Sequence, residues 1–405
     1  MKAQRLSPLE AGGVPARLSV VKVGGSLLLG EADLRRAAAA VAERRRDGEA
    51  LLVVASALKG VTDLLEQLAG QAADRGLHNG HLGRTLEELR RRHLEIAHET
   101  TDDTSVLERV LRALDEVEEL AGAIRAAGEL TEATHARLLS FGERLSVLLL
   151  AAAIRTAGHE ARPIAAEEAG LRANGPSRAG SCDVTASMAG LLRMRRELRD
   201  RVLVLTGFYG IGDDGGVVLF GRGGSDDTAC AVAAGLGAGR LELWKDVPGL
   251  MSADPREVQG AHVIREISFD EVAQLGAYGS RIVHQGCLEH LRGRATQVLI
   301  SAIPEDGSTS GTRLVEKLQR GATKVVALAS RRSPALIGIV GEGVADDPGI
   351  RSRMLSCLAA AGARGDLSAQ PSGRSGLSCT MHPDDLAPAL SGLHDCFFAS
   401  GSAQP

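Results

Sequence analysis

Continuous apolar runs alternate with amphipathic runs near the start of the chain. Residues 18–28 (LSVVKVGGSLL) and 50–65 (ALLVVASALKGVTDLL) each begin as an apolar strand and pass into a loop of small residues. Between them, residues 31–48 have a helical pattern that is closed by Gly48. Strands buried on both faces give continuous apolar runs, whereas the helices that cover them are amphipathic. The alternation predicts a parallel α/β sheet covered by helices on both faces.

The pattern becomes mostly helical over residues 64–140, where no strand signal of appreciable length occurs. Residues 140–158 (SFGERLSVLLLAAAIRTAG) predict a further helix, which ends at Gly158. Residues 201–216 predict a strand followed by a hairpin, and residues 241–256 predict a strand followed by a loop rich in Pro, Gly and Asp. A helical excursion therefore interrupts the α/β pattern before the strands resume.

The chain after residue 312 is short and predicts a β-α-β-β-α pattern. Its strands are expected in KVVALASRRS, ALIGIVGEGV, DLSAQ and GLSCTMHP, and its helices in PGIRSRMLSCLAAAG and DDLAPALSGLHDCFF. Strands and helices mixed in this way are typical of a small α+β domain.

Residues 219–238 (LFGRGGSDDTACAVAAGLGA) predict a strand end, a glycine turn and the start of a helix. The first turn of a helix exposes unpaired N–H groups and the positive end of its dipole, which favours an anion. Arg222 adds a planar group that can grip a carboxylate at two points. Asp226 is out of place there unless a metal ion or a cationic group lies opposite it. The stretch therefore predicts a site for a small charged ligand beside a phosphorylated group.

Composition narrows the classes of function. A chain of 405 residues most readily forms two domains, and its net charge of −4 argues against a general nucleic-acid or membrane binder. Aromatic residues make up only 2% of the chain, which argues against stacking platforms for single-stranded nucleic acid. The longest apolar run, residues 145–154, is about half of a membrane span. Residues 1–17 have no apolar core and are expected to be a flexible tail rather than a signal peptide.

Six cysteines occur in the chain, with no C-x-x-C pair and no zinc-ligand spacing. We therefore predict that they are reduced, small apolar core residues of a cytoplasmic protein. His93 and His98 lie in the helical excursion and are expected to be solvated or packing residues rather than metal ligands.

Lys22 followed by Gly24 and Gly25 matches neither the P-loop nor the G-x-G-x-x-G pattern. The underlying physics is similar, because glycine N–H groups can cradle a phosphate while a lysine offsets the charge of a transferred group. Taken alone, such a pair of glycines after a strand is more often a simple turn.

The motifs taken together, in their order along the chain, resemble those of the aspartokinases of the amino-acid kinase family. The matching segments are VKVGGS, ASALKGVTDLL, RHLEIAHE, SFGERLS, LTGFYG, GRGGSDDTA, ELWKDVPGLMSADPR, ISFDEVAQLGAYGSRIVH and a final Gly-Thr at 311–312. The resemblance covers residues 18–314, which would form the catalytic domain. It implies a three-layer α/β/α fold with a mostly parallel sheet, and a reaction of Mg-ATP with L-aspartate that gives 4-phospho-L-aspartate and ADP, as in amino-acid biosynthesis.

Carried over residue by residue, the resemblance implies roles for the charged groups. Lys22 would bridge the transferring phosphoryl group, helped by the amides of Gly24 and Gly25. Arg222 would hold the α-carboxylate of the substrate, and Glu143 would pair with its ammonium group. Alternatively, Glu143 could be an ordinary acid in the first turn of its helix.

The remaining residues line the amino-acid pocket or the nucleotide site by the same resemblance. Asp226 would organise the metal and the phosphoryl group. The amino-acid pocket would include Ser56, Thr62, Phe208 and Ser225, although Phe208 could also be an ordinary core residue. The nucleotide-binding set would include Lys245, Asp246, Met251, Asp254, Arg256 and Arg281. No metal ligands are assigned, because Mg²⁺ is expected to bind mainly through the ATP phosphates.

The acceptor carboxylate is already ionised at neutral pH, so this chemistry requires no general base. The difficulty lies in bringing two anions together, and lysine, metal and helix N-termini meet it by positioning and electrostatic stabilisation. The lack of a Ser-His-Asp set therefore does not argue against this phosphoryl transfer.

Some positions depart from the usual aspartokinase pattern. Met251 stands where tyrosine is typical, Arg281 where lysine is usual, Gln285 follows His284 in place of proline, and GSDD replaces the frequent GSDY. These differences leave the substrate open between aspartate and a close analogue of a specialised pathway. A non-catalytic regulatory partner is the alternative from another class, but the retention of the charged residues argues against it.

Residues 323–400 resemble a single ACT domain, which has a ferredoxin-like α+β fold. Aspartokinases usually carry two ACT units that together bind feedback amino acids, and here one is expected to be missing or reduced to the KVVALA strand. We therefore expect weak or absent feedback control by lysine or threonine. An unpaired strand edge on this unit would favour a homodimer or larger assembly.

Overall fold

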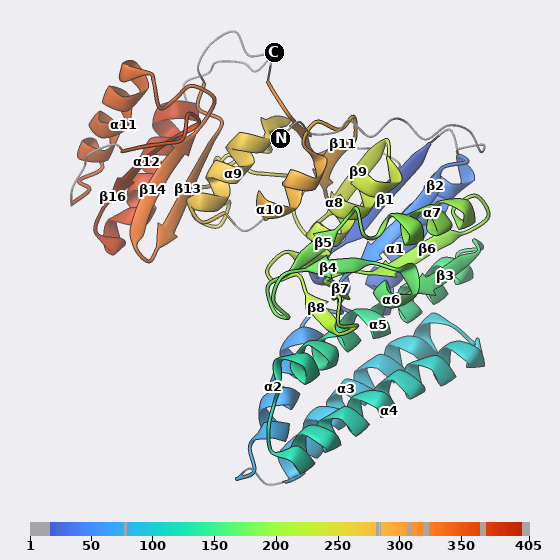
Figure 1. The fold of residues 1–405 in the computed structure, drawn as a ribbon. Helices are drawn as coiled ribbons and strands as arrows, with labels where there is room; N and C mark the ends of the chain where they lie inside the picture. Colours follow the sequence, from blue (N-terminus) through green and yellow to red (C-terminus); the bar gives the residue numbers. More distant parts are fainter. Residues whose placement is uncertain are drawn as a thin grey trace.

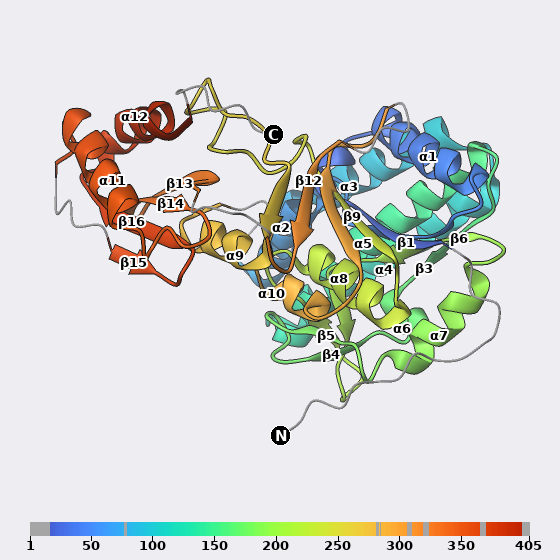
Figure 2. The same ribbon diagram turned by 90° about the horizontal axis from the view of Figure 1, so that it is seen from above.

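The computed structural model describes residues 17–76, 79–280, 283, 285–305, 310–318, 324–364 and 370–398. Within these ranges an eight-stranded sheet forms the centre of the larger part of the molecule (Figures 1 and 2). Its strand order is β10 (Glu266–Ser268), β12 (Thr312–Val315), β11 (Gln297–Ser301), β9 (Arg240–Trp244), β1 (Leu18–Val23), β2 (Ala50–Ala55), β6 (Val202–Thr206) and β3 (Ala161–Ile164). The pairings are parallel except for β11 with β12. The predicted, mostly parallel sheet is confirmed.

Helices cover both faces of this sheet, as its continuous apolar strands require. The helices α1 (Glu31–Arg46) and α5 (Glu132–Thr156) pack against each other, and α8 (Gly224–Leu236) packs against α7 (Met188–Glu197) and α10 (Gln285–Leu288). Right-handed crossovers put the first pair on one face and α7 and α8 on the other, where α10 packs against α8. This arrangement gives the three-layer α/β/α fold.

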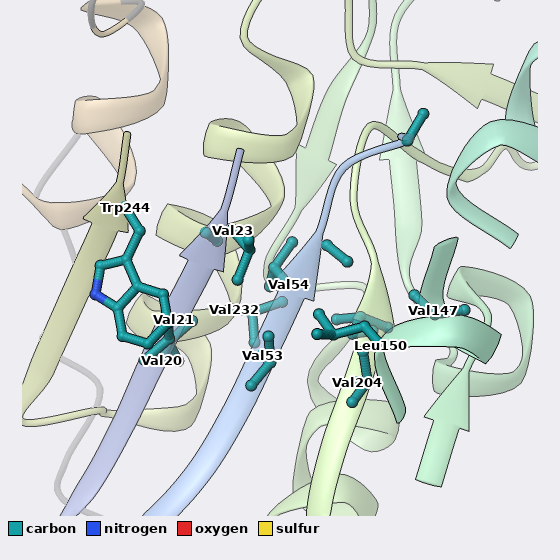
Figure 3. Packing of buried hydrophobic residues seen from close by; sticks show 14 of the residues in the cluster. Val20, Val21, Val23, Val53, Val54, Val147, Leu150, Val204, Val232 and Trp244 are labelled. Carbon is teal, nitrogen blue, oxygen red and sulfur yellow. The ribbon is translucent and has the colours of Figure 1, made fainter. Parts of the chain in front are cut away.

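Figure 3 shows how the layers close on the core. Val20 and Val21 of β1 lie beside Val53 of β2, while Trp244 of β9 and Val232 of α8 pack against the same region. All five are fully buried. The apolar residues that identified the strands in the sequence are therefore the ones that hold the layers together.

The helical excursion predicted over residues 64–140 is confirmed. It consists of α2 (Val61–Ala73), α3 (Asn79–Thr100), α4 (Thr104–Ala127) and the first turns of α5. Figure 1 shows α3 and α4 side by side at the end of the molecule that lies farthest from the C-terminal region. His93, at the buried side of α3, places its Nδ1 2.7 Å from the carbonyl oxygen of Leu89, and burial lowers its pKa to about 4. It is a packing residue.

A second sheet of four short strands lies beside the first. Its order is β5 (Ser181–Asp183), β4 (Arg172–Asn174), β7 (Tyr209–Ile211) and β8 (Val217–Leu219). The short helix α6 (Ala166–Ala169) leads into it from β3. Because β8 runs directly into the glycine turn before α8, this sheet fixes where Arg222 leaves the strand.

The C-terminal region is a four-stranded antiparallel sheet with two helices. Its order is β13 (Ala327–Arg332), β14 (Ala335–Val340), β16 (Gly376–Thr380) and β15 (Gln370–Ser372). The helices α11 (Pro348–Ala360) and α12 (Leu386–Phe398) pack against each other, and α12 packs on β13 and β14. The strand expected at DLSAQ begins at Gln370; residues 365–369 lie outside the described residues. The helix α9 (Phe269–Ala277) joins this region to the central sheet.

The prediction that all six cysteines are reduced is wrong for two of them. Cys357 of α11 and Cys396 of α12 form a disulfide, with their Cα atoms 6.7 Å apart. The pair is brought together by the packing of two helices from distant parts of the sequence, so no local spacing signals it. The other four cysteines form no disulfide and are buried, as predicted: Cys182, Cys230, Cys287 and Cys379.

Two helical glycines give a matched pair for testing the packing. A Cβ at Gly142 of α5 would lie 2.8 Å from the Cβ of Ala57, whereas a Cβ at the exposed Gly122 of α4 would meet nothing within 4 Å. We expect Gly142→Ala to lower the free energy of unfolding by about 1–3 kcal/mol through overpacking. Gly122→Ala should raise it by about 0.5–1 kcal/mol through helix propensity. Urea unfolding of both variants checks this, and equal effects would contradict the close approach of α5 to the loop at Ala57.

No helix in the described ranges is both long enough and apolar enough to span a membrane.

Candidate active site

The site forms where the loops after β1, β2, β6 and β9 meet at one edge of the central sheet. Parallel strands place their carboxyl ends on the same side, and ligands of open α/β sheets bind there. A Cβ at Gly25 would lie 2.8 Å from the carbonyl oxygen of Ala57, and one at Gly24 would lie 3.3 Å from that of Trp244. The glycine loop after β1 is therefore enclosed between the loops after β2 and β9, and Gly25 leaves no room for a side chain.

Two lysines share one carboxylate at the centre of this edge. Lys22 Nζ lies 2.8 Å from Asp226 Oδ1, and Lys245 Nζ lies 2.7 Å from Asp226 Oδ2. Lys22 is 6% exposed and Asp226 is 3% exposed. The two ammonium groups are the cationic partners that an acid at this position requires. The three groups carry one net positive charge at the edge of the sheet.

The proton equilibria of these groups follow from burial and from each other. Burial alone would raise the pKa of Asp226, but the ammonium groups of Lys22 and Lys245 overcome that effect and hold the pKa below its usual value. Burial lowers the pKa of Lys22, against the opposing attraction of Asp226. Asp226 is therefore ionised at neutral pH, with both oxygens engaged by lysines.

The N-terminus of α8 points its amides into the same place. Gly223 precedes the helix with a φ of +73°, and no side chain caps it. The N–H groups of Gly224 and Asp227 donate to the carbonyls of Gly221 and Gly223. Within the part of the chain that the structure describes, the amides of Ser225 and Asp226 have no acceptor. Those two amides are available to an anion.

Glu143 is the second buried acid of the site, and only one of its two carboxyl oxygens has a hydrogen-bond partner among the described residues. Its Oε1 accepts a hydrogen bond of 3.0 Å from the N–H of Ala57, whereas Oε2 is buried and has no partner among the described residues. Burial raises the pKa of Glu143 to about 8. An unpartnered buried carboxylate oxygen indicates a place for a ligand that donates hydrogen bonds.

Phe208 has the only positive φ, +75°, of any non-glycine residue in the described ranges. Its N–H donates to Thr228 Oγ1 at 3.1 Å, and its carbonyl accepts from the N–H of Phe220 at 2.7 Å. A Cβ at Gly224 would lie 2.9 Å from the Phe208 ring. Strained backbone of this kind clusters at functional sites, so the conformation is consistent with the pocket role predicted for Phe208.

The remaining residues predicted for the amino-acid pocket surround this centre. Ser56 follows β2 and donates its N–H to the carbonyl of Val23, at the end of β1. Thr62 is half-buried in the first turn of α2, and Ser225 is buried in the first turn of α8. Arg222 is exposed in the turn before α8, with its side chain accessible to a ligand.

The predicted nucleotide-binding residues are more dispersed. Lys245 joins Asp226, and Asp246 beside it is exposed. Met251 pairs with Val263 in an isolated bridge. Asp254 and Arg256 form a salt bridge of 2.6 Å with each other, with Arg256 largely exposed. Arg281 lies outside the described residues.

One site contact was not foreseen from the sequence. Asp227, the second acid of the GSDD motif, accepts from the Cys182 N–H at 3.0 Å and lies 3.0 Å from His290 Nε2. It therefore fixes the first turn of α8 to β5 and to the short helix at Glu289–Leu291. The departure from the usual GSDY was visible in the sequence, but its partners come from distant segments.

The family model described as the amino acid kinase family matches residues 17–301. The chain belongs to the amino acid kinase family. An ACT domain model matches residues 337–397. These matches confirm the predicted combination of an amino acid kinase fold with a C-terminal ACT domain.

Among the relatives that this family member matches are aspartokinases. The aspartokinase of Mycobacterium tuberculosis is 33% identical over 237 residues, which cover 58% of this chain and 55% of that protein. The lysine-sensitive aspartokinase 3 of Escherichia coli is 28% identical over 345 residues, which cover 85% of this chain and 74% of that protein. The chain thus spans about half the length of the first of these relatives. The resemblance to aspartokinases is confirmed.

Solved aspartokinase structures share the fold. That of E. coli aspartokinase III in complex with aspartate and ADP (R-state) has a TM-score of 0.82 at 22% identity and covers 94% of this chain and 100% of that chain. The structure of the same enzyme with lysine and aspartate (T-state) has a TM-score of 0.69 at 26% identity and covers 90% of this chain and 79% of that chain.

Proposed function

We propose that this chain transfers the γ-phosphoryl group of ATP to the side-chain carboxylate of L-aspartate, giving 4-phospho-L-aspartate and ADP. The observation that carries the proposal is the buried Lys22–Asp226–Lys245 cluster beside the open amides of α8, with the unpartnered oxygen of Glu143 at the same edge of the sheet. Its named relatives are aspartokinases, one of them solved with aspartate and ADP.

In this proposal the amino acid is held by its two charged α-groups. Arg222 binds the α-carboxylate through its planar donors, and Glu143 accepts from the ammonium group through Oε2. Ser56, Thr62, Phe208 and Ser225 line the pocket between them. The side-chain carboxylate is already ionised and attacks the γ-phosphorus without a general base.

The nucleotide occupies the opposite side of the cluster. Lys22 and Lys245 stabilise the negative charge that gathers on the transferring phosphoryl oxygens, and the amides of Gly24, Gly25 and Ser225 position them. Asp246, Met251, Asp254 and Arg256, together with Arg281, are the further residues proposed for ATP. Mg²⁺, when bound to the ATP phosphates, supplies additional neutralisation of their charge.

The side chains at the candidate site fit a metal ion that is bound mainly through the nucleotide phosphates. In the described ranges no group of three or more His, Cys, Asp or Glu side chains could hold a metal ion. Both oxygens of Asp226 are already engaged by lysines. Protein ligands for Mg²⁺ are therefore few, and the phosphates would provide most of its coordination.

Glu143 also favours a free amino acid over an N-acylated one. An ammonium group would stabilise the ionised form of Glu143 as an ion pair, whereas an acylated nitrogen carries no charge and offers it no cationic partner.

The experiment that tests the proposal uses purified protein with Mg-ATP and hydroxylamine. Aspartate is compared with glutamate, N-acetylglutamate and several aspartate analogues, because hydroxylamine converts an acyl phosphate into a coloured hydroxamate. A product with aspartate supports the proposal. A product with an analogue alone would change the substrate and keep the mechanism, and no product with any compound would overturn the proposal.

We also propose a homodimer that forms through the ACT domain. The strand β15 is at one edge of its four-stranded sheet, and an open strand edge favours pairing with a second copy. At the other edge, the N–H of Leu328 in β13 already donates to the carbonyl of Ser252. Light scattering after size exclusion would give twice the chain mass, and a monomer at all concentrations would contradict the dimer.

Feedback control by lysine or threonine is proposed to be weak, because the ACT domain match covers a single unit, residues 337–397. Kinase activity should therefore fall by less than twofold with micromolar lysine and threonine, added alone or together. Strong inhibition under these conditions would overturn the expectation.

A further inference from the structure

The loop that follows β9 is built partly into the core of the ACT domain. Ala253 and Val258 are buried in the same hydrophobic cluster as Leu328, Leu377 and Leu393, and this cluster is separate from the main core. Leu250, just before them, belongs to the main core. The segment that carries Asp254 and Arg256 therefore takes its position from the C-terminal domain.

Ser252 is the polar centre of this junction and is fully buried. Its N–H donates to the carbonyl of His262 at 2.8 Å, and its Oγ accepts from the N–H of His262 at 3.0 Å. Its carbonyl accepts from the N–H of Leu328 in β13 at 2.7 Å. Its Oγ also lies 3.0 Å from His394 Nε2 on α12. One serine thus joins the loop to both a strand and a helix of the ACT domain.

His394 is held against Ser252 by close packing. It is 3% exposed, and a Cβ at Gly260 would lie 3.3 Å from its Cε1. Phe398, one turn further along α12, has its ring centroid 4.7 Å from that of His394 and 5.3 Å from that of His262. Burial lowers the pKa of His394, and the nearby His262 lowers it further. A neutral His394 is the form that packs between these rings.

Cys396 lies between His394 and Phe398 on the same helix and is bonded to Cys357 of α11. Both cysteines are half-buried rather than enclosed in the core of the domain. Arg353 of α11 donates to the carbonyl of Cys396, and its guanidinium carbon lies 4.9 Å from the centroid of the Phe397 ring. The disulfide is the covalent part of the attachment that holds the last turn of α12 on α11.

We propose that the Cys357–Cys396 disulfide is a redox control of nucleotide binding, transmitted by His394 to Ser252 in the loop 251–256. The inference rests on the proposed function, which assigns this loop to ATP. A dithiol delivers two electrons and two protons: the S–S bond breaks, Cys357 and Cys396 become thiols, and the dithiol becomes a disulfide. The last turn of α12 then loses its covalent attachment, and Ser252 loses a fixed partner.

His394 and Ser252 are positioning residues in this mechanism, because neither lies among the residues proposed to contact substrate. The amino-acid pocket depends on Glu143 and Arg222, which are on α5 and on the turn before α8, outside the ACT core. Reduction should therefore change the interaction with ATP and spare the interaction with aspartate. This split between the two substrates distinguishes the proposal from a general loss of stability.

The test measures steady-state kinetics of the full chain before and after treatment with dithiothreitol. Alkylation and mass spectrometry establish the state of each cysteine. Reduction is expected to raise KM for ATP by about five- to tenfold, a typical size of coupling between sites, and to change KM for aspartate by less than twofold. Direct binding of ADP by calorimetry should weaken by the same factor.

Three variants sharpen the test. The double variant Cys357→Ser/Cys396→Ser should have the weaker ATP binding of the reduced protein and no response to dithiothreitol. Cys379→Ala, which removes a buried cysteine of the same domain that is not part of the disulfide, should keep the full response. His394→Ala should weaken ATP binding in the oxidised state, and His394→Gln, which retains a hydrogen-bonding group, should restore part of it.

The outcomes separate this inference from the proposed function. Equal ADP binding in the oxidised and the fully reduced protein would overturn the redox control while leaving the kinase assignment intact. Two alkylated thiols at positions 357 and 396 in protein purified without reductant would also overturn it. If neither state binds ADP, the proposed function fails first and the inference with it.

Discussion

Lys22→Ala is expected to lower kcat for aspartate phosphorylation by about 10³-fold, the size of effect seen when a preorganised charge at a transition state is removed. Lys22 is the most deeply buried cation of the candidate site, and its ammonium lies 2.8 Å from Asp226. With alanine there, the charge on the transferring phosphoryl oxygens would lose one of its two lysine partners. Single-turnover measurements with saturating ATP would separate this chemical step from binding.

The protein should remain folded in this variant. Asp226 keeps its contact with Lys245, so the substitution does not leave a buried carboxylate without a cation. Lys59→Ala is the matched control, since Lys59 is an exposed lysine in a neighbouring loop and should leave kcat unchanged. Undiminished turnover by folded Lys22→Ala would remove the phosphoryl-transfer role proposed for this lysine.

Aspartate binding is expected to tighten by about ninefold between pH 6 and pH 7 and by about fivefold between pH 7 and pH 8, in step with the ionised fraction of Glu143. The pKa of Glu143 is raised to about 8 in the ligand-free site, so below pH 8 its carboxyl group is mostly protonated. Pairing with an ammonium group requires the carboxylate, and binding must therefore release a proton. Calorimetry in two buffers of different ionisation enthalpy would measure the released proton directly.

Glu143→Gln should weaken aspartate binding at pH 8 by about 100-fold or more and abolish its pH dependence, because a buried cation would lose its anionic partner. The glutamine can still accept from the N–H of Ala57, so the local backbone retains its contact. Glu95→Gln makes the same chemical change on the exposed surface of α3 and should have no effect. An affinity that is independent of pH in the wild-type protein would contradict the role of Glu143.

The same pKa has a consequence for the stability of the ligand-free protein. Between the ordinary value of 4.5 and the raised value of about 8, the folded state binds more protons at Glu143 than the unfolded state does. The contribution of this residue to the free energy of unfolding therefore falls as pH rises through that window. Glu143→Gln should remove that part of the pH dependence, which denaturant unfolding at pH 6 and pH 8.5 would measure.

The sequence by itself determined the elements and the type of site. Continuous apolar runs such as 18–28 and 50–65 can be satisfied only as strands buried on both faces, so the parallel sheet could be predicted from composition along the chain. The glycine turn before α8 also has a local cause, since positive φ at Gly221 and Gly223 favours glycine. The order of the motifs then identified the resemblance to aspartokinases.

Only the tertiary structure decided which of these groups meet. Lys22, Asp226 and Lys245 are in contact because β1, α8 and β9 converge at one edge of the sheet, and nothing in their spacing indicates which lysine pairs with which oxygen. The strain at Phe208 was equally hidden, because it depends on hydrogen bonds to Thr228 and Phe220.

In the C-terminal region, too, the sequence could predict the elements but not the contacts between them. Its strands and helices follow from local pattern, yet the Cys357–Cys396 bond and the contact between Ser252 and His394 join residues that are far apart in the sequence. Local propensity and hydrophobic periodicity act over a few residues, whereas these contacts depend on how the helices and strands pack against each other. The sequence therefore determined which segments form helices and strands. The packing of these segments decided which side chains form ion pairs, hydrogen bonds or a disulfide.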